Sequence, residues 1–345
     1  MNGDYLAWGP YGWGLYGISN QDGKLSFEPG NGVPEGIITP GLVDVHIHGA
    51  FGIDFMSADQ TAMSSLCDNL AGKGYEAFLP TTVTAPLGDV ERAIGNLPDH
   101  PMVAGFHLEG PFISPKHPGA QPPESIRTVD GGWDKVLDDP KLRIVTLAPE
   151  QPGGLELVRR LAARGVIASL GHTDATFDEA AEAGLTGADH ATHTFNAMRP
   201  FHHREPGTVG WVLREDQTYA ELIYDRIHVH PESAALLLQC KPKDKVVGVS
   251  DSTMASGLPP GTEVQMWGHD CVVGSGSVRL KSNGALAGST ATLLDVFQNL
   301  ASDFGPETAT RCCAVNPRAR LRMPLEPARY LRFSMDFQLR DIWEC

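Results

Sequence analysis

The 345-residue sequence predicts an α/β protein, built as a (β/α)8 TIM-like barrel with a small β-sandwich appendage formed by the N- and C-terminal segments. Three observations support this fold class. Short apolar runs typical of buried strands recur along the chain. Amphipathic segments of helical spacing separate them. Polar residues follow the ends of several runs, where a barrel carries its active site. A doubly wound sheet shares the alternation and stays open as an alternative.

The expected strands number eight. They cover residues 43–48, 77–84, 102–109, 142–148, 166–172, 188–194, 220–229 and 246–251. Segments with apolar residues at helical spacing lie between them, at 60–71, 154–163, 177–183 and 231–239. Because a strand that returns through a crossover helix runs parallel to its predecessor, this order predicts a parallel sheet.

The two ends of the chain are expected to form the small β domain, as residues 1–38 and 313–345, around a barrel of residues 39–312. Residues 18–27 form a hairpin-like run with Asp22–Gly23 as its turn pair. The C-terminal segment returns to short mixed runs that include 333–339. We expect these runs to pair with the N-terminal hairpin.

Composition excludes several classes of protein. A formal charge of −15 argues against nucleic-acid binding, which needs a basic face. No apolar run approaches the ~20 residues that a membrane span requires. The six cysteines have no Cys-x-x-Cys spacing and indicate reduced thiols in a cytoplasmic protein. The N-terminus lacks the basic and apolar regions of a secretory signal.

Two histidines close the first expected strand, in the stretch IITPGLVDVHIHG at residues 37–49. Side chains alternate across a strand, so His46 and His48 point to the same side. Two imidazoles on one face can share a metal ion. The alternative is a pair of core histidines whose hydrogen bonds are satisfied internally.

Other strand ends carry matching donors. Glu109, His172 and His193 follow or end three further expected strands. Nitrogen and oxygen donors of this kind suit one or two divalent ions, zinc or iron, and a carboxylate can bridge two ions. Asp251 ends the eighth strand and could serve as the general base and acid. Helix and turn capping remain the alternatives for Glu109 and Asp251, and His107 is expected to pack behind the ligands.

Several motifs resemble those of a known family. PGLVDVHIHG at 40–49 resembles the first-strand signature of the amidohydrolase superfamily. HLEGPFISPK at 107–116 and THTFNAM at 192–198 are similar to motifs of the N-acetylglucosamine-6-phosphate deacetylases, as are the blocks at 171–173, 204–207, 250–251 and 286–289. The resemblance runs from about residue 37 to 300. The fourth strand, 142–148, has no lysine to be carbamylated, which is consistent with the glutamate-bridged branch.

The resemblance implies a role for each residue. Glu109, His172 and His193 would hold one metal, and His46 and His48 would hold a second beside Glu109. Asp251 would be the acid and base. The implied substrate contacts are Gln121, Asn196, Ala197, Arg204, His228 and Leu286. Among them, His228 would contact the sugar or polarise the acetamide carbonyl.

The implied reaction is the hydrolysis of N-acetyl-D-glucosamine 6-phosphate to D-glucosamine 6-phosphate and acetate, in amino-sugar catabolism and cell-wall recycling. A homodimer is also implied, because in the family the phosphate site can borrow a residue from a neighbouring subunit.

One block departs from the family pattern. The family usually has Gly-Ala-His after its HLEGP block, whereas this chain has Gly119–Ala120–Gln121. Glutamine keeps hydrogen bonding but carries no charge. This keeps open a deacetylase of N-acetylgalactosamine 6-phosphate or of another N-acetylated sugar phosphate. A non-catalytic sugar-phosphate sensor is the third hypothesis, against which the retained Asp251 argues.

Overall fold

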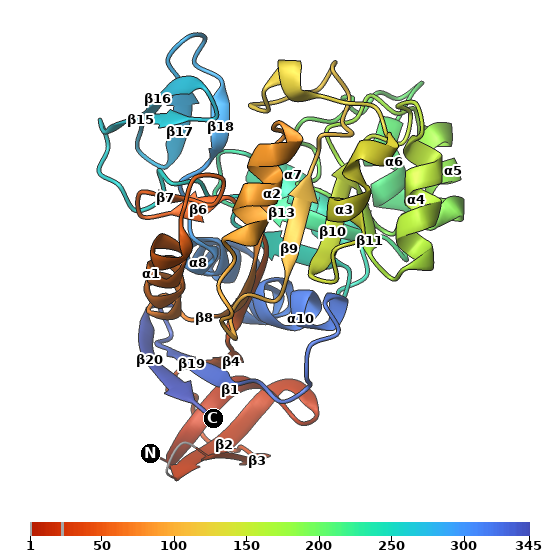
Figure 1. Ribbon diagram of the computed structural model, residues 1–345. Helices are drawn as coiled ribbons and strands as arrows, with labels where there is room; N and C mark the ends of the chain where they lie inside the picture. Colours follow the sequence, from red (N-terminus) through yellow and green to blue (C-terminus); the bar gives the residue numbers. More distant parts are fainter. Residues whose placement is uncertain (1, 22–23) are drawn as a thin grey trace.

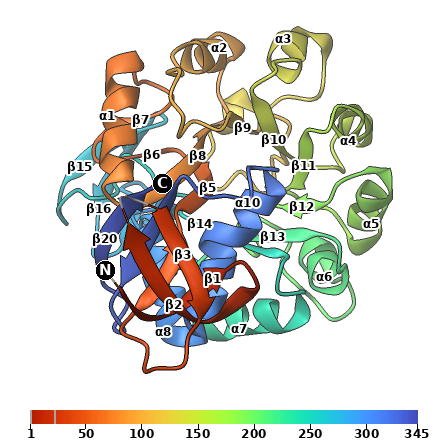
Figure 2. The ribbon, with the colours of Figure 1, turned by 90° about the horizontal axis from the view of Figure 1, so that it is seen from below.

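The central sheet is a nearly closed barrel of eight parallel strands (Figures 1 and 2). A computed structural model describes residues 2–21 and 24–345. In spatial order the strands are β5 (Leu42–Ile47), β8 (Tyr75–Thr82), β9 (Phe106–Glu109), β10 (Leu142–Leu147), β11 (Ile167–Leu170), β12 (His190–Ala191), β13 (Tyr219–Ile223) and β14 (Val246–Val249). A parallel bridge between Ile47 and Ser252 brings the first and last strands together. The predicted barrel is confirmed.

Helices surround the strands, as Figure 2 shows. They are α1 (Gln60–Ala71), α2 (Leu87–Gly95), α3 (Asp134–Leu137), α4 (Gly154–Ala163), α5 (Phe177–Thr186), α6 (Gly207–Arg214), α7 (Pro231–Cys240) and α8 (Leu293–Phe304). All four predicted helices are present, and α1 and α4 begin and end where predicted. In the described parts of the chain, no helix has both the length and the apolar character needed to cross a membrane.

Local sequence signals explain where the helices begin. Asp59 accepts a hydrogen bond from the backbone of Ala62 and caps α1. Thr176 and Glu179 form a reciprocal capping box at the start of α5. Along α1, Met63 and Leu70 lie on one buried face, because residues seven apart return to the same side of a helix. The barrel core therefore receives one apolar stripe from each such helix.

The two ends of the chain form one six-stranded sheet. Its order is β20 (Leu339–Glu344), β19 (Arg329–Phe333), β4 (Ile37–Pro40), β1 (Asn2–Gly9), β2 (Gly12–Gln21) and β3 (Lys24–Pro29). The hairpin of β2 with β3 is confirmed, while its predicted turn Asp22–Gly23 lies outside the described residues. The C-terminal segment joins the same sheet as expected, but β19 pairs with β4 rather than with that hairpin. The described strands make a single sheet, where two facing sheets were expected.

The run 333–339 is a turn rather than a strand. Phe337 has φ 63° and its backbone donates to the carbonyl of Ser334, which reverses the chain between β19 and β20. Figure 1 places this terminal sheet below the barrel. The predicted domain bounds at 38/39 and 312/313 stay a prediction. Strand β4 runs across the first bound. Helix α10 (Asn316–Arg320) begins just beyond the second bound and packs on the barrel strands β5 and β14.

A second small sheet, which was not predicted, lies on the other side. It is antiparallel and consists of β15 (Glu263–Met266), β16 (His269–Val273), β17 (Ser277–Leu280) and β18 (Leu286–Ser289). It is inserted between β14 and α8 and appears at the top of Figure 1. A bridge from Ser289 to Ser252 attaches it to the barrel just beyond β14. The insert therefore forms one wall of the barrel mouth.

Candidate metal and substrate site

The five predicted metal ligands converge at the carboxyl ends of the barrel strands. His46 is the penultimate residue of β5, His48 follows that strand directly, and Glu109 ends β9. His172 lies two residues beyond β11 and His193 two residues beyond β12. Oε1 of Glu109 lies 3.1 Å from Nε2 of His193, 3.2 Å from Nε2 of His172 and 3.3 Å from Nε2 of His46. Its Oε2 lies 3.4 Å from Nε2 of His48. All five side chains are buried.

Three of the predicted metal and acid–base residues have left-handed backbone conformations. His172, His193 and Asp251 have φ values of 48°, 30° and 45°. Residues without glycine's freedom rarely adopt such angles, and they concentrate at functional sites. Each lies two residues after a strand end. The chain thus turns sharply there, at the barrel mouth.

The proton positions on the imidazole rings follow from their outer partners. Nδ1 of His48 lies 3.1 Å from the carbonyl oxygen of Thr81, and Nδ1 of His172 lies 3.0 Å from that of His117. A carbonyl only accepts hydrogen bonds, so both Nδ1 atoms carry the proton. Nδ1 of His46 faces a carboxylate oxygen of Glu221 at 3.0 Å. The Nε2 atoms of the neutral rings therefore present lone pairs to the site.

These lone pairs face one another and need positive charge between them. Nε2 of His46 lies 3.3 Å from Nε2 of His48. Nε2 of His172 lies 3.1 Å from Nε2 of His193, whose Nδ1 is buried without a hydrogen-bond partner. Two neutral acceptors cannot form a hydrogen bond. Although burial opposes the charged ring, hydrogen bonds to Asp251 and Glu109 raise the pKa of His48 to about 9. A divalent cation meets the same demand, so the residues fit a metal.

The donors fall into two groups that share Glu109. One is His46, His48 and Glu109, and the other is Glu109, His172 and His193. Within each group the donor atoms lie within 4.8 Å of one another. Imidazole and carboxylate donors suit zinc and ferrous iron. The geometry accommodates one or two ions.

Asp251 adjoins the first group. Its Oδ1 lies 3.2 Å from Nε2 of His48 and 3.5 Å from Nε2 of His46. Burial alone would raise the pKa of Asp251, but the facing histidines lower it below the usual value. The carboxylate is therefore ionised at neutral pH and can accept a proton.

His228 is fixed by a neighbour three residues earlier. Nδ1 of His228 lies 2.6 Å from Oδ2 of Asp225, whose other oxygen accepts the backbone N–H groups of Ile227 and His228 at 2.8 Å. Burial opposes the charged ring, yet Asp225 raises the pKa of His228. The ring is thereby held with Nε2 free to donate into the pocket.

A pocket of about 210 Å³ surrounds this centre. Of the predicted substrate contacts, it includes Gln121, Asn196, Ala197, His228 and Leu286. Arg204 lies outside the lining, on an exposed loop where its guanidinium is 3.0 Å from Nε2 of His203. Among the described residues that line the pocket there is no lysine or arginine.

Gln121 lines the pocket with both polar atoms of its amide already paired. Its Nε2 donates to Oε2 of Glu109, and its Oε1 accepts the backbone N–H of Thr84 at 2.6 Å. The amide thus supports the shared carboxylate, while its nitrogen keeps a second N–H group. The predicted contact of Gln121 with substrate stays a prediction.

Sequence reasoning missed two residues that support the site, Glu221 and Asp225. Glu221 on β13 binds Nδ1 of His46, Nε2 of His190 at 3.1 Å and the backbone N–H of His193 at 3.0 Å. Asp225 fixes His228. The signal for Glu221 was a lone charged residue inside an apolar strand. His107 stays behind the ligands as expected, since its ring nitrogens pair with Val45 and Thr146.

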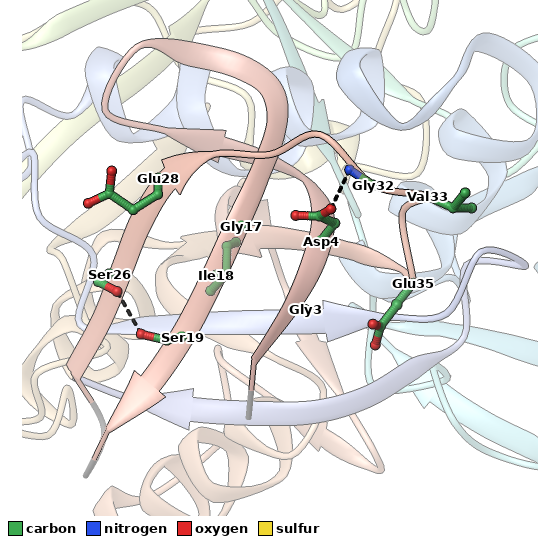
Figure 3. Close-up of a pocket in the computed structure, with 10 residues that line it drawn as sticks. All are labelled: Gly3, Asp4, Gly17, Ile18, Ser19, Ser26, Glu28, Gly32, Val33 and Glu35. Atoms are coloured by element: carbon green, nitrogen blue, oxygen red, sulfur yellow. Dashed lines mark hydrogen bonds between the residues drawn. The ribbon is translucent and has the colours of Figure 1, made fainter.

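A larger hollow in the terminal sheet does not share this chemistry. It measures about 580 Å³ and has Asp4, Glu28 and Glu35 in its lining, with the hydroxyls of Ser19 and Ser26 hydrogen-bonded at 2.7 Å (Figure 3). It contains no histidine and no basic side chain among its described lining residues. Its carboxylates repel anions. The candidate site is therefore the pocket at the barrel mouth.

Comparisons with known proteins find a matching family and similar relatives. Residues 37–317 match the Amidohydrolase family. The N-acetylglucosamine-6-phosphate deacetylase of Bacillus subtilis (strain 168) is 40% identical over 268 residues, which cover 74% of this chain and 67% of that protein. The N-acetylgalactosamine-6-phosphate deacetylase of Escherichia coli O157:H7 is 35% identical over 306 residues, covering 86% and 78%.

A solved structure is similar over nearly the whole chain. It is a mutant of the N-acetyl-D-glucosamine-6-phosphate deacetylase from Mycobacterium smegmatis in complex with N-acetyl-D-glucosamine-6-phosphate. The sequence identity is 28% and the TM-score 0.88, and the match covers 96% of this chain and 93% of the other.

Proposed function

Because this chain belongs to the amidohydrolase family, we propose that it hydrolyses N-acetyl-D-glucosamine 6-phosphate to D-glucosamine 6-phosphate and acetate. The observation that carries the proposal is the meeting of five metal donors, an ionised aspartate and a fixed histidine in one pocket. Amide hydrolysis needs these three parts: an activated water, a proton carrier and a donor facing the carbonyl oxygen.

The residues divide the chemistry among them. A bound divalent cation supplies a lowered pKa for the attacking water and positive charge near the carbonyl. Asp251 takes a proton from the water as the new C–O bond forms. His228 donates its Nε2–H to the carbonyl oxygen, where negative charge develops. When the C–N bond breaks, Asp251 returns the proton to the amine nitrogen, so that the base is regenerated.

The metal assignment remains part of the proposal. Glu109, His172 and His193 would hold one ion, and His46 and His48 with Glu109 a second, either zinc or iron. The shared oxygens of Glu109 support a site for two ions. Glu221 supports it as well, because a carboxylate behind a ligating imidazole fixes its tautomer and raises its basicity.

The phosphate end of the substrate is assigned to Asn196 and Ala197, with Leu286 near the sugar. No basic side chain lines this pocket among the described residues, and Arg204 lies on an exposed loop. A phosphate dianion calls for an arginine or lysine. We therefore propose a homodimer in which a neighbouring subunit completes the phosphate site. A cytoplasmic location and roles in amino-sugar catabolism and cell-wall recycling belong to the same proposal.

A second candidate substrate is N-acetylgalactosamine 6-phosphate, the epimer of N-acetylglucosamine 6-phosphate. It is favoured by the similarity to the Escherichia coli protein, which is named for N-acetylgalactosamine 6-phosphate. The ratio of kcat/KM on the two epimers separates the candidates. We expect the glucosamine epimer to be preferred.

Acetate release from N-acetyl-D-glucosamine 6-phosphate by metal-loaded protein tests the proposal. Wild type should turn over, and Asp251→Asn should lower kcat by about 100-fold or more, since general acid–base catalysis contributes at least that much. Elemental analysis of both proteins controls for metal loss. Absence of acetate from fully metal-loaded, folded wild type would refute the assigned reaction.

A further inference from the structure

Trp267 stands between two cavities. It lies in the turn from β15 to β16 and lines the catalytic pocket together with His48 and Asp251. It also lines a neighbouring cavity of about 520 Å³. Gln121 borders the first cavity and Pro122 the second, so the two spaces meet along this wall.

Apolar residues make up half of the lining of the neighbouring cavity. Besides Trp267, they are Met56, Val83, Ala85, Pro86, Pro122, Met254 and Met266. Asp54, Asp89, Arg92 and Glu124 contribute the charged part of the lining. Flexible methionine side chains adapt to alkyl groups of different shape. The cavity therefore has room and surface for a short alkyl chain.

The indole is held firmly in place. Its Nε1–H donates to Oδ2 of Asp54 at 3.0 Å, and Asp54 is itself buried and accepts the backbone N–H of Met56 at 2.7 Å. The indole packs edge-on against the His48 ring, with centroids 5.2 Å apart. Trp267 also has φ 54°, a conformation that disfavours large residues. Fixed contacts thus hold a bulky residue in a turn that suits glycine or asparagine.

The direction of the acyl group follows from the proposed function, on which this inference rests. If the phosphate lies at Asn196 and Ala197, the amide must reach across the pocket to His48 and Asp251. The acyl carbon is attacked there, so the alkyl end of the acyl group continues towards the next wall. That wall is Trp267.

We propose that Trp267 determines the acyl-chain specificity of the enzyme. The indole closes the catalytic pocket behind an acetyl group and blocks the passage into the neighbouring apolar cavity. Longer acyl groups collide with the ring. A shorter side chain at position 267 joins the two cavities and admits them.

The test compares kcat/KM for N-acetyl- and N-butanoyl-D-glucosamine 6-phosphate. Wild type should favour the acetyl substrate. In Trp267→Ala the butanoyl-to-acetyl ratio should rise about 10-fold or more, as expected for chain-length discrimination in an apolar pocket. Trp267→Leu is the second variant, because leucine keeps an apolar contact at the turn while shortening the side chain. It should shift the ratio in the same direction.

Met56→Ala is the matched control. It enlarges the neighbouring cavity without opening the wall, so its ratio should equal that of wild type. An unchanged ratio in folded, metal-loaded Trp267→Leu and Trp267→Ala would overturn the proposal, as would equal use of both substrates by wild type. If wild type hydrolyses neither substrate, the proposed function fails and this inference falls with it.

Discussion

Oε2 of Glu221 lies 3.0 Å from Nδ1 of His46, and neither side chain is exposed to solvent. Burial would raise the pKa of Glu221, but the facing His46 and His190 hold it well below the usual value. Glu221→Gln keeps the shape and removes the charge. An amide cannot accept all three hydrogen bonds that the carboxylate accepts. We expect metal affinity to fall about 10- to 100-fold, as for other groups behind metal ligands.

A competition titration with a chromogenic chelator measures this affinity. Glu263→Gln serves as the control, because Glu263 is an exposed residue of the small sheet that pairs with Lys281. Its affinity for metal should equal that of wild type. Wild-type affinity in Glu221→Gln would show that the carboxylate does not support His46.

Metal removal should destabilise the fold. The donor side chains come from β5 and β9 and from the turns after β11 and β12, which lie far apart in the unfolded chain. A ligand that binds only the folded state stabilises it by about 3–4 kcal/mol at 100 to 1,000 times its Kd. Thermal unfolding with and without a chelator measures the loss, and added metal should restore it. A variant with His172 and His193 both replaced by alanine should show a smaller shift. An unaltered unfolding temperature after proven metal loss would contradict this expectation.

Gln121 should act through Glu109 rather than through the substrate. Gln121→Leu removes the amide that pairs with Glu109 and with the backbone of Thr84. An unpaired buried N–H costs about 1–3 kcal/mol, so the free energy of unfolding should fall by that amount. In kinetics, kcat should fall more than KM rises. The exposed Gln217→Leu should change neither quantity. A rise in KM alone would return Gln121 to direct substrate contact.

The barrel was predictable because its signals are local. Each strand is an apolar run, and the five predicted ligands lie at or just beyond strand ends. The same runs therefore predicted both the fold class and the positions of the ligands. The small sheet of 263–289 was missed because its strands are short, and β15 in particular is mostly exposed. The Asn283–Gly284 pair between β17 and β18 was the clearest local signal of a hairpin there.

The supporting residues depend on contacts across the barrel. Glu221 meets His46 at a separation of 175 residues, which no periodicity encodes. The pairing of Gln121 with Glu109 depends on the path of a loop, so the sequence could state only that glutamine replaces an expected histidine. Arg204 was assigned by resemblance, and its position on an exposed loop could not be read from the motif.

The pH dependence of activity should report on the pair of Asp225 and His228. Asp225 raises the pKa of His228, so the ring stays charged to a higher pH than an ordinary histidine. If the charged ring donates to the carbonyl oxygen, kcat/KM declines as pH rises through this raised pKa. Asp225→Asn removes the raising charge. The basic limb of the profile should therefore move to lower pH.

The free energy of unfolding should also depend on pH through the raised pKa of His228. A histidine whose pKa is higher in the folded state stabilises the fold fully below the unfolded pKa, and this contribution is lost as pH rises through the folded pKa. As pH rises through the folded pKa of His228, the free energy of unfolding of wild type should therefore fall towards that of Asp225→Asn. Urea unfolding at several pH values measures it. A basic limb at the same pH in both proteins would show that His228 does not act as the charged donor.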